Sequence, residues 1–146
     1  MIIKNGVHVL SFIIQAAENF CIHQIRAEHT ISQLPSRMRT LIAYLDIKDK
    51  DGGSHRIYLG CDDVLIQSIA KIFLDEELSD VETLQDMLLE TTNMIIGSAK
   101  VLAEEEPRSS FSISTPHLQE ESLLTVDEQY TISVGNGEMM LAIKAL

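Results

Sequence analysis

Four residues near the middle of the chain have types and spacing that could do chemistry. They are two carboxylates, a carboxamide and a glycine, at Asp86, Glu90, Asn93 and Gly97. On a helix that turns by about 100° per residue, these positions fall within roughly 60° of one another and form one polar line. Glu90 and Asn93 are neighbours at i and i+3, and Asp86 lies one turn before Glu90. The line offers charged and hydrogen-bonding groups side by side.

The same spacing argues against a metal site. Successive members of the line lie about 5–6 Å apart at Cβ. One helix face cannot surround a small cation such as Mg²⁺, which demands octahedral oxygen ligands at ~2.1 Å. The five histidines also lack ligand spacing such as HxxxH. We therefore expect this chain to bind no metal and no other cofactor.

A solvated helix surface is the alternative explanation for the polar line, because any helix that faces water needs a polar side. Two details favour a function. Asparagine is a poor residue inside a helix, because its side chain competes for backbone hydrogen bonds. Gly97 costs about 1 kcal/mol relative to alanine at such a position. A residue that disfavours its local structure often serves another purpose, and Gly97 would let another backbone or side chain approach beside Asn93.

The segment from Asp86 to Pro116 resembles the signature of the CheC/CheX/FliY family of chemotaxis phosphatases. In that signature an Asp or Ser is followed by E-x-x-N at fixed spacing, and a proline comes 22 residues later. Here 22 residues separate Asn93 from Pro116. The flanking segments N-M-I-I-G and F-S-I-S-T-P are also similar to the family.

The resemblance implies a phosphatase that acts in trans on the aspartyl phosphate of a phosphorylated CheY-type response regulator. It implies that Asn93 positions the attacking water and that Glu90 anchors docking through an ion pair with the regulator's active-site lysine. Asp86 and Gly97 would support this pair, and Pro116 would shape a strand end beside the helix. Any Mg²⁺ would belong to the regulator.

Two other interpretations stay open. Some relatives of this fold belong to the flagellar switch, so the chain could be a non-catalytic module that binds a response regulator or the switch. The chain could also be an acidic scaffold domain in which the motif is accidental. An intact motif argues against pure binding, because a binder does not need Asn93 to orient water.

The number of motif copies separates two branches of the family. CheC-like members carry two copies, and CheX-like members carry one. The first predicted helix offers only Glu18, which is followed three positions later by Cys21, so the E-x-x-N spacing fails there. We therefore expect a single site and a CheX-like protein. CheX-like proteins are dimers joined through sheet edges, so the resemblance also implies a homodimer.

The elements that must position these residues follow from the hydrophobic periodicity. Apolar residues recur every three or four positions over 7–21, which predicts a helix. Strands are expected over 38–47 and 55–59, joined by the turn D-K-D-G-G. Asp62 and Asp63 can cap a second helix, which would run over Val64, Leu65, Ile69, Ile72 and Phe73. Ser79 and Glu82 have capping-box spacing and predict a third helix that ends at about Glu104.

The rest of the chain has the pattern of strands. They are expected at 111–114, 123–126, 130–134 and 139–145, with G-N-G as a hairpin turn before the last. This order predicts an α+β fold in which an antiparallel sheet packs against long helices. The side of the third helix that faces the core is expected to hold Leu84, Leu88, Ile95, Ala99 and Leu102.

Composition limits the partners. The 146 residues contain 11 Lys and Arg against 22 Asp and Glu, a net charge of −11. Such a chain is not expected to bind nucleic acid or an anionic membrane surface. The length suggests one domain over 1–146, and the hydrophobic content of 45% excludes a disordered chain.

Compartment and redox state follow from two further features. No apolar stretch approaches the ~18 residues of a membrane span, and no A-x-A cleavage site follows the N-terminal apolar run. We therefore expect a cytoplasmic protein. Cys21 and Cys61 lie in apolar stretches without CxxC spacing, which predicts two buried thiols and no disulfide or zinc site.

Overall fold

The computed structural model describes residues 5–33, 41–120 and 124–146. In chain order its elements are α1 (Asn5–Phe20), the π-helical turn η1 (Cys21–Ile25), β1 (His29–Ser32), β2 (Leu41–Asp49), β3 (Ser54–Cys61), α2 (Asp63–Leu74), α3 (Val81–Glu104), the 3₁₀ turn η2 (Pro107–Ser109), β4 (Phe111–Ile113), β5 (His117–Leu118), β6 (Glu128–Val134) and β7 (Gly137–Ala145). The predicted α+β class is confirmed.

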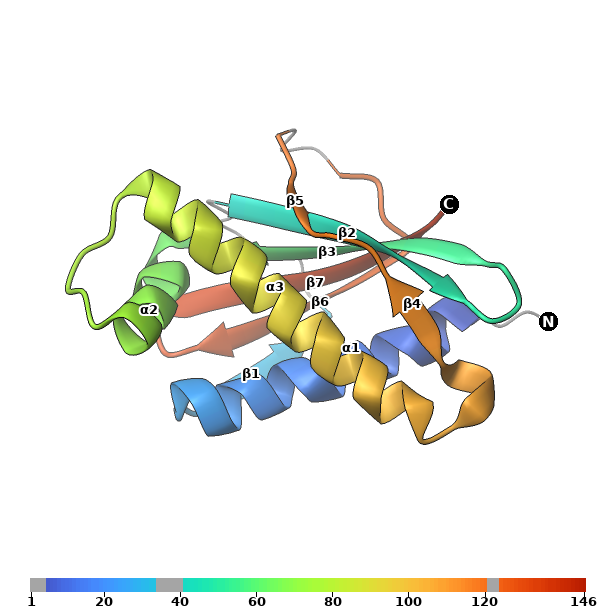
Figure 1. Cartoon of the computed structure of the whole chain (residues 1–146). Coiled ribbons are helices and arrows are strands. Elements are labelled where there is room, and N and C mark those ends of the chain that lie inside the picture. Colours follow the sequence, from blue (N-terminus) through green and yellow to red (C-terminus); the bar gives the residue numbers. More distant parts are fainter. Residues whose placement is uncertain (1–4, 34–40, 121–123) are drawn as a thin grey trace.

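The strands form one antiparallel sheet in the order β1-β6-β7-β3-β2-β4, and β5 also pairs with β2. The two long helices, α1 and α3, lie across the same face of this sheet, and the shorter α2 lies at one end (Figure 1). The two predicted hairpins, β2–β3 and β6–β7, are present and bring β3 and β7 to the centre of the sheet.

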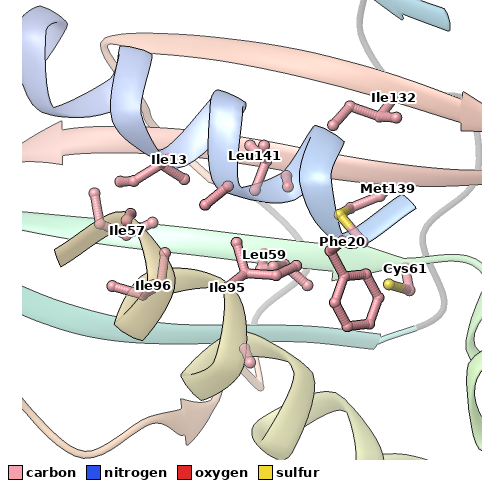
Figure 2. Packing of buried hydrophobic residues seen from close by; sticks show 14 of the residues in the cluster. Ile13, Phe20, Ile57, Leu59, Cys61, Ile95, Ile96, Ile132, Met139 and Leu141 are labelled. Atoms are coloured by element: carbon pink, nitrogen blue, oxygen red, sulfur yellow. The ribbon is translucent and has the colours of Figure 1, made fainter. Parts of the chain in front are cut away.

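The main core lies between the helices and one face of the sheet. Ile13 of α1 and Ile95 and Ile96 of α3 pack toward Ile57 and Leu59 of β3 (Figure 2). All five side chains are at most 1% exposed. Because alternate residues of a strand point to opposite faces, the intervening Tyr58 belongs to a second cluster on the other face, together with Ile42, Met140 and Ala142.

The strand predicted at 123–126 is wrong for the residues that the structure describes. Leu124 and Val126 are not in a strand, and residues 121–123 lie outside the described ranges. Instead, Leu124 and Val126 pack against the second cluster. Burial against the sheet therefore explains why these residues are apolar, although they do not pair as a strand.

Strand β1 was not predicted, because its segment reads as polar. It pairs with β6 and three of its four residues are exposed, including Ile31 at 38%. An edge strand with so little burial has no alternating apolar pattern to reveal it. The first three residues of the predicted strand at 38–47 lie outside the described ranges.

The start of α2 is fixed to the β6–β7 turn by a capping residue and a glycine. Asp62 is the N-cap of α2, as predicted: its Oδ1 accepts from the Leu65 N–H at 2.9 Å, and its Oδ2 accepts from the Glu138 N–H at 3.1 Å. A Cβ on Gly137 would come within 2.8 Å of the Leu65 Cβ. Only glycine therefore permits this approach of turn and helix.

Candidate functional site

Helix α3 carries all the helical residues of the predicted site. It runs over Val81–Glu104 and is roughly 36 Å long at ~1.5 Å per residue. The predicted core-facing side is confirmed, since Leu84, Leu88, Ile95 and Ala99 are at most 4% exposed and Leu102 packs against the same cluster. The opposite side of α3 can therefore present side chains to a partner.

The predicted start of α3 at a capping box is wrong. The N-cap is Asp80, whose carboxylate accepts from the Thr83 N–H at 2.8 Å. Ser79 is buried, and its backbone N–H donates to the side chain of Gln67 on α2 at 3.0 Å. Contact with α2 therefore holds Ser79, and the next residue, Asp80, supplies the cap instead.

Asp86, Glu90 and Asn93 are all exposed on the outer side of α3. Within the described ranges, none of the three side chains forms a hydrogen bond or an ion pair. The structure thus brings the predicted carboxylates and carboxamide onto one exposed line, with their polar atoms available to a partner. A rigid helix held by its buried side fixes their spacing.

Gly97 continues this line, one turn beyond Asn93. It is half-buried, and a Cβ built at this position would meet nothing within 4 Å. Gly97 therefore differs from Gly137, where a larger residue would collide with Leu65 of the same chain. The packing of this chain gives no reason for a glycine at position 97, so the space beside Asn93 is open to another molecule.

Two buried threonines beside the pair were not anticipated. Thr91 and Thr92 are both 0% exposed. The Thr92 hydroxyl donates to the Leu88 carbonyl at 2.8 Å, whereas the Thr91 hydroxyl has no partner among the described residues. Threonine is small and polar, so its sequence pattern does not indicate burial. Their burial widens the packed side of α3. On the opposite side, Asp86, Glu90, Asn93 and Gly97 form a narrow line, which we call the exposed strip.

Pro116 lies in the connection between β4 and β5, directly before His117, and is half-buried. Strand β5 pairs with β2 and contacts α3. The structure therefore brings this end of the motif to the neighbourhood of α3 through β5, although 22 residues separate Pro116 from Asn93 in the chain.

Helix α1 offers no comparable pair. The Oε2 of Glu18 lies 2.9 Å from the Nε2 of His29 on β1. Cys21, three residues later, is buried in the core. The carboxylate of Glu18 is therefore engaged by its own chain, in contrast to Glu90.

The remaining reactive groups lie away from the exposed strip. Both cysteines are free and buried, as predicted. Burial, with a smaller effect of the nearby Glu18, raises the pKa of Cys21 to about 11. Burial also raises the pKa of Cys61. Neither thiol forms the reactive thiolate near neutral pH. Among the described residues, no three His, Cys, Asp or Glu side chains lie together as metal ligands.

Comparison with solved structures places this fold in a class. The chemotaxis protein CheX from Vibrio vulnificus has a TM-score of 0.76 at 18% identity, over 95% of this chain and 99% of that chain. CheX from Desulfovibrio desulfuricans has a TM-score of 0.73 at 17% identity, with coverages of 95% and 99%. A chain of the CheX–CheY–BeF₃–Mg²⁺ complex from Borrelia burgdorferi has a TM-score of 0.67 at 15% identity, with coverages of 93% and 97%. The chain thus has the fold of CheX-like chemotaxis proteins.

Sequence comparison agrees with the fold. The family model of the chemotaxis phosphatase CheX matches residues 45–136, which is more than half of the chain. The chain therefore belongs to the CheX family. No curated protein sequence matches it. None of the helices that the structure describes has both the length and the apolar character needed to cross a membrane.

Proposed function

We propose that this chain is a phosphatase that hydrolyses the aspartyl phosphate of a CheY-type response regulator, acting in trans from the exposed strip of α3. The observation that carries the proposal is the pair Glu90 and Asn93, exposed and without internal partners, at the family's motif spacing on a CheX fold. The solved complex of a similar protein with CheY, BeF₃ and Mg²⁺ supports a regulator of this type as partner. We propose that this chain and the regulator meet in the cytoplasm.

The proposed chemistry needs little from this chain. Phosphoryl transfer is accelerated mainly by positioning and charge stabilisation. The Asn93 carboxamide aligns a water, whose oxygen bonds to phosphorus as the aspartyl oxygen leaves as a carboxylate. The water's protons stay with the inorganic phosphate or solvent. Glu90 pairs with a lysine of the regulator and holds Asn93 in register.

Mg²⁺ is proposed to enter only with the regulator. The three oxygen-bearing side chains of the strip lie along one helix face and cannot enclose a small cation. Calorimetry of the isolated chain with Mg²⁺ should therefore show no stoichiometric site. A tight site that disappears in Glu90→Ala would mean that this chain is itself a metal-dependent hydrolase, and the proposal would be wrong.

The central test is Asn93→Ala. Removing a group that orients a reactant commonly costs about 100-fold or more in rate, so phosphate release from the phosphorylated regulator should fall by that factor. Binding to the regulator activated with beryllofluoride should stay within about threefold, because Asn93 acts on the water. Thr125→Ala, on the segment that covers the other face of the sheet, is the control. Wild-type rates in Asn93→Ala would contradict the assigned role.

A non-catalytic binding module is the alternative, and the same assay separates it. A binder would form the complex with the activated regulator without shortening the lifetime of the phosphoaspartate. The homodimer is likewise a proposal. It is supported by β1, an exposed edge strand that pairs with β6 alone among the described residues. Light scattering at about 100 µM protein tests it, because a dimer with a dissociation constant well below that concentration would be mostly assembled. A monomeric mass would exclude such a dimer.

A further inference from the structure

A pocket between α1 and α3 opens directly beside the exposed strip. Its volume is about 320 Å³. Helix α3 contributes Met94, Ile95 and Ser98, and the residues before Met94 and Ser98 are the motif residues Asn93 and Gly97. A protein docked over the strip would therefore also cover the mouth of this pocket.

The pocket has an apolar floor and a polar rim. Ala16, Phe20 and Ile95 form the floor and are 2%, 6% and 1% exposed. The floor is rigid, because the Phe20 ring stacks on Phe73 of α2 with centroids 6.1 Å apart. Met94, which follows Asn93 in α3 and is half-buried, also lines the pocket. A methionine side chain is flexible and polarizable, so it can adapt to an apolar guest and contact an aromatic ring.

The rim of the pocket carries hydrogen-bonding side chains. Asn19, His23, Gln24 and Ser98 are exposed, and their side chains form no hydrogen bond within the described ranges. None of the described lining residues is Asp, Glu, Lys or Arg. In a chain of net charge −11, a pocket without a carboxylate among its described lining residues favours an apolar side chain flanked by backbone amides over a cationic one.

We infer that this pocket receives an apolar, aromatic side chain from the regulator surface next to the phosphorylated aspartate. The inference rests on the proposed function and adds a second contact to it. Glu90 would form an ion pair with the regulator, and the pocket would bury one of its side chains away from water. Buried anchors of this kind contribute most of the binding energy of many interfaces. Its size is at the lower end of the ~300–1,000 Å³ of small-ligand pockets, which suits one large side chain.

The test fills the pocket from its rim. Ser98→Phe places a ring over the mouth, and Thr125→Phe is the matched control on the segment across the sheet. We expect Ser98→Phe to raise KM for the phosphorylated CheY-type regulator of the same organism by tenfold or more. Its kcat at saturation should stay within about twofold, because Asn93 is untouched. Asn19→Phe, on the opposite wall, repeats the test should Ser98→Phe fail to fold.

Three outcomes overturn the inference: unchanged KM in both filled variants, an equal rise in Thr125→Phe, or a loss confined to kcat. Failure of the proposed function looks different, since the wild-type chain would then not accelerate dephosphorylation at all. In that case, titration of the same variants with the beryllofluoride-activated regulator still tests the pocket. Equal affinities of wild type and Ser98→Phe would overturn it, and a tenfold loss in Ser98→Phe alone would support it.

Discussion

The side chains of Glu90 and Asn93 have no internal hydrogen-bond or ion-pair partner among the described residues. Two other carboxylates are engaged by their own chain: Asp46 binds Arg56 through two contacts of 2.7 and 3.0 Å, and Glu18 binds His29. Arg56 also lies over the Tyr44 ring at 4.2 Å. Side chains without internal partners, at i and i+3 on a rigid helix, need not break other contacts before binding. The free-energy cost of arranging them for the complex is therefore small.

Glu90→Gln should weaken regulator binding and turnover together. Glutamine keeps the shape but cannot neutralise a lysine, and leaving a charge unpaired in an interface is costly. We expect at least a tenfold loss of affinity at low salt, equal to about 1.4 kcal/mol. The difference from wild type should shrink as salt rises, because screening weakens the ion pair only in wild type. Asp86→Asn is the comparison variant, with a smaller loss. Unchanged affinity with lost activity would instead give Glu90 a chemical role.

Gly97→Ala should stabilise the chain and impair its function at the same time. Alanine favours a helix by up to about 1 kcal/mol over glycine, and nothing in this chain lies within 4 Å of the added methyl group. The melting temperature should rise by about 2–4 °C. Affinity for the activated regulator should fall, because the methyl group occupies the clearance beside Asn93. Val64→Ala, at an exposed position on α2, controls for helix propensity. Full activity in Gly97→Ala would show that no close approach occurs there.

At the scale of elements, the orientation of the exposed strip depends on how α3 is held. Its N-terminus is capped by Asp80, its buried side packs on α1 and the sheet, and its C-terminus ends shortly before the η2 turn. The strip therefore moves only if the helix moves. The stability of the first turn of α3 depends on the charge of the Asp80 carboxylate, and therefore on pH.

Asp80 should make the start of α3 sensitive to acid. The Thr83 N–H, which donates to the carboxylate, lowers the pKa of Asp80 in the folded protein. A lowered folded pKa means that the stabilisation is complete above the unfolded pKa, near ~3.9. It is lost as pH falls through the folded value. Asp80→Asn keeps a capping oxygen but cannot titrate, so its stability should decline less steeply below about pH 4.

Thermal melts of wild type and Asp80→Asn between pH 2 and pH 7 measure this difference. Asp51→Asn is the matched control, because Asp51 is exposed in the β2–β3 turn and makes no capping bond in the described structure. Parallel acid slopes for wild type and Asp80→Asn would refute the linkage.

At the scale of the whole molecule, two helices cover one face of the sheet, and a short apolar segment covers part of the other. The central strand β7 is buried on both faces over most of its length. Cys21 and Cys61 lie in the helix-side core, from η1 and β3. Any reagent that reaches them must wait for the molecule to open.

The two thiols should therefore report global opening. With the pKa of Cys21 raised to about 11 and Cys61 fully buried, neither should react with a disulfide reagent at pH 8 over minutes. Both should react in denaturant, because the unfolded pKa of a thiol is near ~8.5. A cysteine at exposed position 68 provides the fast-reacting comparison. Rapid modification of one native thiol would mean that η1 or β3 opens locally.

The sequence by itself determined the features that depend on neighbours along the chain. The helical period placed Glu90, Asn93 and Gly97 on one outer side of α3, and the N-cap of α2 is one of the two residues predicted to cap it, Asp62. The two hairpins followed from their turn residues. These features are local, because helix periodicity, capping and tight turns involve residues within about four positions of one another.

Only the tertiary structure decided the rest, because it depends on residues distant in the chain. Strand β1 exists through pairing with β6, across roughly a hundred residues, and Leu124 and Val126 are apolar because they cover the sheet. Packing of α2 against Ser79 moved the cap of α3 to Asp80. The same packing logic separates Gly137, which Leu65 requires, from Gly97, which faces open space. Sequence placed Gly97 in a helix and Gly137 in a hairpin turn. It could not show which of them is closely surrounded, because that depends on which distant atoms lie around the missing side chain.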